Sequence, residues 1–94
     1  MEITGTITKV LPERKGSGQH GEWRVASYVL VTGGLRPSYF VFDVFDGMDG
    51  RINRLGIEAG KEMTIYFDID AHEYQGKWFN TIRAYDAREV KKEG

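Results

Sequence analysis

Hydrophobic side chains alternate with polar ones along five segments of the chain, and this period of two constrains the fold more than any other feature. The first segment, residues 2–11, places Ile3, Ile7 and Leu11 on one face and three threonines on the other. Successive side chains of a β-strand point to opposite sides, so the pattern predicts a strand with one buried face. The same reasoning predicts four more strands, over residues 23–32, 39–45, 62–73 and 78–88.

One stretch breaks the alternation. Met48, Ile52 and Leu55 recur at helical spacing, which predicts a short helix over residues 48–56 that ends at Gly56. The order of elements is then β-β-β-α-β-β. This is the order of an OB-fold, an all-β, five-stranded Greek-key barrel with one short helix. An SH3-like barrel is the alternative, but it has no helix at this place.

The 94 residues are enough for a single domain, which we assign to residues 1–89, with a charged tail over residues 90–94 that is expected to fray. No apolar run approaches the length of a membrane span, and the N-terminus lacks a signal-peptide pattern. The absence of cysteine excludes disulfides and thiolate chemistry and fits a cytoplasmic location. The net charge of −1 argues against a histone-like, purely electrostatic binder of nucleic acid.

The positions of alternate residues also predict which side chains face the barrel interior. In residues 39–45 the even positions are all apolar, so Tyr39 and Phe45 are expected to point outward. In residues 23–32, Val25 and Ser27 are expected to share the outward face with Trp23. The predicted core consists of Ile7, Tyr28, Leu30, Phe42, Val44, Ile65, Phe67 and Ile82, with Met48 or Ile52 of the helix closing one end. Gly5 predicts a bulge or a tight bend in the first strand.

Three patterns suggest catalysis or cofactor binding, and each has a simpler interpretation. Residues 16–21 spell GxGxxG, but a strand follows where a dinucleotide site needs a helix, so we interpret residues 12–22 as a flexible hairpin loop. Asp43, Asp46 and Asp49 lack the spacing of a calcium loop and are interpreted as solvated carboxylates near a helix N-terminus. The two histidines are too few for a zinc site. We expect no enzyme activity, catalytic residue, metal or cofactor.

Aromatic residues make up 13% of the chain and need an explanation. Outward-facing Tyr39 and Phe45 are costly unless they bind something. The alternative is that Phe45 packs under the helix and Tyr39 lies along the surface with its hydroxyl in water. Proteins that bind single-stranded nucleic acid combine exposed aromatic faces for the bases with cations for the phosphates. Residues 9–36 have a net charge of +3 and residues 77–94 a net charge of +2, so a basic surface can form if these segments lie side by side.

Several segments resemble the bacterial single-stranded DNA-binding protein family, and the chain looks like a compact single-domain branch of it. Gly18-Gln19 followed by Tyr28-Val29-Leu30-Val31-Thr32 is similar to the second-strand region of that family. The resemblance continues in Val41-Phe42-Asp43-Val44-Phe45, in Gly60-Lys61-Glu62-Met63-Thr64-Ile65 and in Tyr74-Gln75-Gly76-Lys77-Trp78-Phe79. On this match, Tyr39, Phe45 and Tyr74 occupy positions where the family places base-stacking aromatics.

The chain also departs from the family. Asp43 and Asp46 stand where a phosphate-binding surface favours Lys or Arg, Phe67 replaces a glycine, and the family's acidic tail is replaced by Lys91-Lys92-Glu93-Gly94. The resemblance therefore implies the fold more strongly than the affinity for DNA.

We predict a non-catalytic protein that binds single-stranded DNA, or RNA, with little sequence preference, in DNA replication or repair. It is expected to form a homo-oligomer, either a dimer or a tetramer, with no membrane association. The alternative is a protein-interaction or assembly module in which the same aromatics form an interface. Arg14 and Lys15 of the mobile first loop are additional phosphate partners. The predicted binding residues are Trp23, Arg24, Arg36, Tyr39, Phe45, Tyr74, Lys77, Trp78 and Arg83.

Overall fold

The computed structural model describes residues 1–19, 21–47 and 49–91, and it contains the expected elements in the expected order, with one additional strand. Met48 and most of the tail that was expected to fray therefore lie outside the described residues. The elements are β1 (Glu2–Val10), β2 (Arg14–Gly18), β3 (Gly21–Val31), β4 (Tyr39–Asp46), α1 (Arg51–Leu55), β5 (Glu62–Tyr74) and β6 (Lys77–Glu89).

The sheet closes on itself. Its strands follow the order β1-β5-β6-β4-β3-β2, and β1 also pairs with β3, so five strands form a ring and β2 extends it at one side. All pairings are antiparallel except that of β4 with β6, which is parallel and is made at Asp43 and Arg83. This closed Greek-key sheet with one short helix is the predicted OB-fold barrel.

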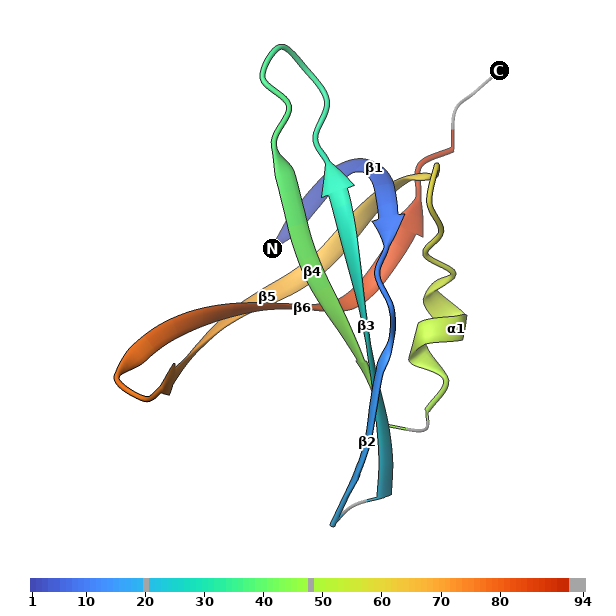
Figure 1. The fold of residues 1–94 in the computed structure, drawn as a ribbon. Coiled ribbons are helices and arrows are strands. Elements are labelled where there is room, and N and C mark those ends of the chain that lie inside the picture. Colours follow the sequence, from blue (N-terminus) through green and yellow to red (C-terminus); the bar gives the residue numbers. More distant parts are fainter. Residues whose placement is uncertain (20, 48, 92–94) are drawn as a thin grey trace.

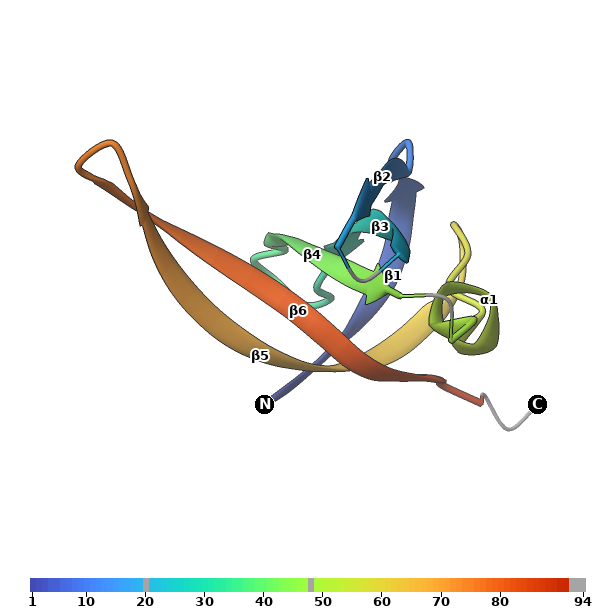
Figure 2. The ribbon, with the colours of Figure 1, turned by 90° about the horizontal axis from the view of Figure 1, so that it is seen from below.

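The β5–β6 hairpin extends far beyond the barrel (Figure 1). From Asp68 to Tyr74 and from Lys77 to Asn80 every residue is exposed, whereas the earlier part of β5 alternates between buried and half-buried positions. We call residues 68–80 the arm. The arm curves away from the barrel on one side of β4, and the hairpin of β2 with β3 lies on the other side (Figure 2).

The predicted core is confirmed almost entirely. Ile52 of α1 closes the core as expected, together with Ile57. Ile82 is only partly buried, because it lies at the base of the arm, but it packs against the core. The predicted residues that the structure buries are Ile7, Tyr28, Leu30, Phe42, Val44, Ile65 and Phe67.

Of the two roles predicted for Gly5, a bulge or a tight bend with no room for a side chain, the bulge is wrong. The irregularity of β1 falls between Ile7 and Lys9, so Gly5 is not part of a bulge. Instead, a Cβ atom at Gly5 would lie 2.3 Å from the Val31 carbonyl oxygen and 2.6 Å from Leu30 Cδ2. Glycine is therefore required here because β3 passes directly over it.

The predicted flexible loop over residues 12–22 is wrong, because Arg14–Gly18 forms β2 and pairs with β3. Gly16 lies opposite Trp23, and a Cβ atom at Gly16 would be 2.2 Å from Trp23 Cζ2. The missing side chain thus lets the indole cover β2 and hold the hairpin together. Val25 and Ser27 lie on the outward face of β3, as predicted, opposite Phe45 and Asp43. Both are nevertheless buried, because the β2 hairpin covers this part of the face.

Candidate nucleic-acid interface

A groove runs across the outward surface of β4, between the β2 hairpin and the base of the arm. Its first part, the hairpin-side hollow, has a volume of about 390 Å³. The side chains come from β2, β3, β4, β5 and β6, so the closed barrel is what brings these distant segments together. The hollow is lined by Arg14, Trp23, Val25, Asp43, Phe45, His72, Thr81 and Arg83.

Phe45 and Arg83 form the centre of the groove. The guanidinium carbon of Arg83 lies 4.7 Å from the centroid of the Phe45 ring, a cation–π contact between β4 and β6. The Phe45 side chain faces outward, as predicted, and remains 38% exposed. Arg83 lies one residue along from Ile82, and this alternation turns it away from the core. The contact joins an aromatic face and a positive charge at a single point.

The groove continues past this pair into a second hollow of about 470 Å³, which we call the helix-side hollow. Arg51 of α1 lines this hollow and brings a positive charge to it. The Nε atom of Arg51 lies 3.6 Å from Asp49 Oδ2, too far for a hydrogen bond. This Nε is buried and has no hydrogen-bond partner within residues 1–19, 21–47 and 49–91. The lining residues are Phe45, Arg51, Asp68, Ile69, Asp70, Arg83, Ala84 and Tyr85.

A carboxylate lies in the floor of the hairpin-side hollow. Ser27 Oγ donates a hydrogen bond of 2.5 Å to Asp43 Oδ1, and Arg14 Nη2 lies 3.8 Å from Asp43 Oδ2. Arg14 also donates to Ser27 Oγ at 3.4 Å, so it bends over both side chains from β2. Asp43 is therefore held in place from β2 and β3, and its side chain is only 21% exposed.

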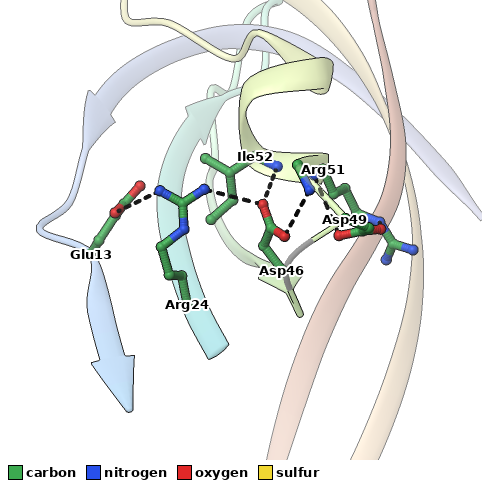
Figure 3. A network of polar contacts seen from close by, with 7 residues as sticks. Glu13, Arg24, Asp46, Asp49, Arg51 and Ile52 are labelled. Atoms are coloured by element: carbon green, nitrogen blue, oxygen red, sulfur yellow. Dashed lines mark hydrogen bonds and ion pairs between the residues drawn. The ribbon is translucent and has the colours of Figure 1, made fainter. Parts of the chain in front are cut away.

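Asp46 does not belong to the solvated carboxylates that the sequence suggested. Its Oδ1 accepts a hydrogen bond of 3.1 Å from the Gly50 amide, and its Oδ2 accepts one of 3.0 Å from the Ile52 amide (Figure 3). The residue is 2% exposed. Asp46 therefore satisfies the free amides at the start of α1 and fixes this helix to the end of β4.

These hydrogen bonds lower the pKa of Asp46 from 3.8 to about 2. The Ile52 amide is the largest cause, burial acts in the opposite direction, and Asp49, Gly50 and Arg24 lower the pKa further. The carboxylate is therefore ionised at neutral pH although it is buried.

Arg24 pairs with this buried carboxylate. Its Nη2 lies 3.3 Å from Asp46 Oδ2, and its Nη1 lies 3.7 Å from Glu13 Oε2 (Figure 3). The predicted phosphate partner is thus placed between two carboxylates, where its charge offsets theirs. It links β3 to the start of α1.

The structure divides the predicted binding residues into separate groups. Trp23, Phe45 and Arg83 come together in the groove. Tyr74, Lys77 and Trp78 lie at the tip of the arm. Tyr39 is 76% exposed at the far end of β4, about 20 Å from Phe45 at the rise of an extended strand, and Arg36 precedes it in the loop after β3.

The strand register further separates the residues at the arm tip. Tyr74 pairs with Lys77, two positions beyond the pair of His72 with Phe79, so all four share the groove-side face. The rings of His72 and Phe79 stack with centroids 5.8 Å apart. Trp78 pairs with Glu73 and lies on the opposite face of the arm.

Four residues that line the two hollows were not predicted from the sequence as part of a site: His72, Thr81, Arg51 and Tyr85. For Thr81, the signal was present: it alternates with Ile82 and therefore shares the outward face of β6 with Arg83. Arg51 could not be found in this way, because its place depends on how Asp46 seats the helix. Arg14 and Lys15 were expected on a mobile loop but belong to β2.

Within the described parts of the chain, no group of three or more His, Cys, Asp or Glu residues is arranged to hold a metal ion. The helix that is described there is also too short and too polar to cross a membrane.

The barrel has the fold of single-stranded DNA-binding proteins. The mitochondrial single-stranded DNA-binding protein Rim1 of S. cerevisiae superposes with a TM-score of 0.68 at 13% identity, over 99% of this chain and 96% of that one. The N-terminal domain of the PriB protein from Thermoanaerobacter tencongensis gives 0.67 at 16%, over 98% and 96%. The small single-stranded DNA-binding protein of Streptomyces coelicolor gives 0.51 at 6%, over 96% and 92%.

The sequence itself places the chain in a family. Residues 2–88 match the profile described as Domain of unknown function (DUF3127), and the chain belongs to this family. A search of curated proteins found no match.

Proposed function

We propose that this protein binds single-stranded DNA in the groove across β4, by base stacking and phosphate contacts and without catalysis. The observation that carries the proposal is the meeting of Trp23, Phe45 and Arg83 in one groove between the β2 hairpin and the arm. These are the parts of an OB barrel that flank its usual oligonucleotide surface.

The chemistry of the groove suits a single strand of nucleic acid. Trp23 is 43% and Phe45 38% exposed, so both rings present apolar area that a base can cover. Arg14, Arg51 and Arg83 offer guanidinium groups, which bind phosphates and also stack on bases. Stacking is tolerant of sequence because every base has a π-face, so the rings themselves give little base preference.

The fold comparisons support this location without carrying the function across. Two of the three structural neighbours are described as single-stranded DNA-binding proteins, but their identities of 13% and 6% leave the side chains free to differ. The role in replication or repair, the use of DNA rather than RNA and the cytoplasmic location remain part of this proposal.

The test compares two exposed aromatics on the same face of the same strand. Phe45→Ala should weaken binding of a labelled thymine oligonucleotide of about 6 nucleotides by about 5- to 150-fold, the value of one base stack. Tyr39→Ala should change it less than about 2-fold, because the groove crosses β4 at Phe45, whereas Tyr39 lies about 20 Å away along β4 and lines neither hollow. Fluorescence polarisation at low salt measures both.

Correct folding of each variant is checked by its melting temperature. Equal affinities of the wild type and a folded Phe45→Ala variant would remove the groove from consideration. If the wild type bound neither DNA nor RNA, the proposed function itself would be wrong.

An assembly role is the second candidate, and one observation favours it. Tyr39 and Val41 are 76% and 51% exposed, and they pair with the half-buried Val31 and Val29 on the outward face of the barrel. This patch lies beyond the groove, so it is available for contact between copies while DNA is bound. We propose a homo-oligomer that uses it; the PriB N-terminal domain, a structural neighbour, is described as dimeric.

Sedimentation and oligonucleotide affinity, measured on the same variants, distinguish the assembly role from the DNA-binding role. Val41→Asp should change the sedimentation of the protein and leave the affinity for a short oligonucleotide unchanged. If Phe45→Ala instead changed the sedimentation, and no oligonucleotide bound, the assembly role alone would remain.

A further inference from the structure

A carboxylate in the floor of a groove that binds a polyanion needs a reason. Asp43 lies two residues from Phe45 on the same outward face of β4, and both line the hairpin-side hollow with Trp23. A phosphate placed there would be repelled. A base stacked on either ring would instead bring its polar edge toward the carboxylate.

Asp43 is fixed rather than free to turn away. Its partner in the β3–β4 register is Ser27, whose hydroxyl donates to Oδ1, and Arg14 approaches Oδ2 at 3.8 Å. A carboxylate has about four lone-pair positions, so these two contacts leave acceptor positions open. Arg83 lies beside it, paired with Asp43 in the β4–β6 register. The floor therefore presents an acceptor next to guanidinium donors.

This arrangement matches the edge of one base. Guanine presents two neighbouring N–H donors, at N1 and N2, beside the O6 acceptor, so a carboxylate can accept both donors while a guanidinium donates to O6. Thymine presents one N–H between two carbonyl oxygens, and the second carboxylate oxygen would face a carbonyl. Cytosine and adenine present one amino group beside a ring acceptor, and they lie between these extremes.

We propose that Asp43 makes one position of the groove selective for guanine over thymine, in a site that is otherwise tolerant of sequence. The inference rests on the proposed binding of single strands. Each bidentate contact between a side chain and a base discriminates by about 5- to 150-fold, and this is the preference expected for one guanine in a thymine strand.

The experiment measures three labelled strands of about 12 nucleotides by fluorescence polarisation: all thymine, thymine with one central guanine, and thymine with one central inosine. Inosine lacks only the N2 amino group. The wild type should bind the guanine strand about 5- to 150-fold more tightly than the thymine strand, with the inosine strand between them. Asp43→Asn should bring all three affinities within about 2-fold of one another, because an amide offers one acceptor and adds a donor.

Asp86→Asn is the matched control. Asp86 lies on β6 outside both hollows, and its side chain is 47% exposed, so this variant should keep the full preference for guanine. Equal binding of all three strands by the wild type, or an unchanged preference in Asp43→Asn, would overturn the inference and leave the proposed function standing. Absence of binding to every strand would overturn both.

Discussion

The two halves of the β5–β6 hairpin show the same strand pattern with opposite results. In the barrel half, Met63, Ile65 and Phe67 are buried and alternate with half-buried positions. In the arm, the same alternation continues, yet Ile69 is 51% and Trp78 69% exposed. The difference lies outside the hairpin. The register of β1 with β5 ends at Tyr66 and that of β4 with β6 lies at Arg83, so within the described residues no further strand pairs with the arm.

The arm is held in place by the barrel, and what it adds is exposed surface rather than core. A two-stranded hairpin alone is at best marginally stable in water. The arm therefore depends on the ladder from Met63–Glu89 to Tyr74–Lys77, whose register shifts once, between Tyr66 and Phe67, and its exposed aromatics do not stabilise the core. Truncations in the two halves should thus separate stability from binding.

The largest expected effect comes from the barrel. Leu30 is fully buried, so Leu30→Ala should lower the free energy of unfolding by about 2–5 kcal/mol, the usual range for such a truncation. Ile69→Ala, an aliphatic truncation in the arm, should lower it by less than about 1 kcal/mol, because the side chain is already half in water. Urea unfolding at neutral pH measures both.

Similar losses of unfolding free energy in the two variants would show that side chains of the arm stabilise the fold as much as those of the barrel, contrary to the burial pattern. A loss below about 0.5 kcal/mol for Leu30→Ala would mean that the face assignment of β3 is wrong.

The same contrast explains how far the sequence could predict the structure. Alternation correctly placed Phe42 and Val44 inside and Phe45 outside, because the two faces of β4 differ in polarity. It placed Val25 and Ser27 on the outward face but could not show that they are buried, because the cover over that face comes from β2, a glycine-rich strand with no hydrophobic pattern. Local pattern predicts which faces differ, but not which distant segment covers them.

The same limit applies to the candidate site, of which the sequence predicted only a part. Trp23, Phe45 and Arg83 were chosen by residue type and face, and the barrel brings them together. The roles of Asp46 and Arg24 depend on contacts between β3, β4 and α1, which no periodicity encodes. Buried polar networks are set by tertiary geometry, and sequence patterns of exposure misjudge them.

Two carboxylates, Asp46 of the barrel and Asp70 of the arm, should contribute differently to the stability of the fold. Because the folded-state pKa of Asp46, about 2, lies below the ordinary value of 3.8, its ionised form stabilises the fold above about pH 4, and this contribution is lost as the pH falls toward 2. Asp46→Ala should cost about 1–3 kcal/mol at pH 7, since it leaves the Gly50 and Ile52 amides without their acceptor. It should also remove this part of the acid dependence.

Asp70→Ala serves as the control, because Asp70 is exposed on the arm and, among the residues that the structure describes, its carboxylate accepts a hydrogen bond only from the amide of Ala71. The free energy of unfolding of this variant should stay within about 0.5 kcal/mol of the wild type at pH 7. Like the wild type, the variant should lose stability as the pH falls from 4 to 2. Thermal melting between pH 2 and pH 7 gives the profiles. An Asp46→Ala variant that kept the wild-type acid dependence would contradict the assigned role.

The smallest expected effect decides whether the arm takes part in binding. Three guanidiniums line the groove, those of Arg14, Arg51 and Arg83. At about 0.7 counterions per phosphate of a single strand, they predict a slope of log affinity against log salt of about −2 for a strand of about 6 nucleotides. A strand of about 16 nucleotides can also reach Lys77, which shares the groove-side face of the arm, and should give a slope steeper by about 0.7. Lys77→Gln should abolish that increment and leave the slope of the short strand unchanged. If Lys77→Gln made the salt slope of the short strand shallower, the arm tip would belong to the primary site. If the variant changed the slope of neither strand, binding would be confined to the barrel.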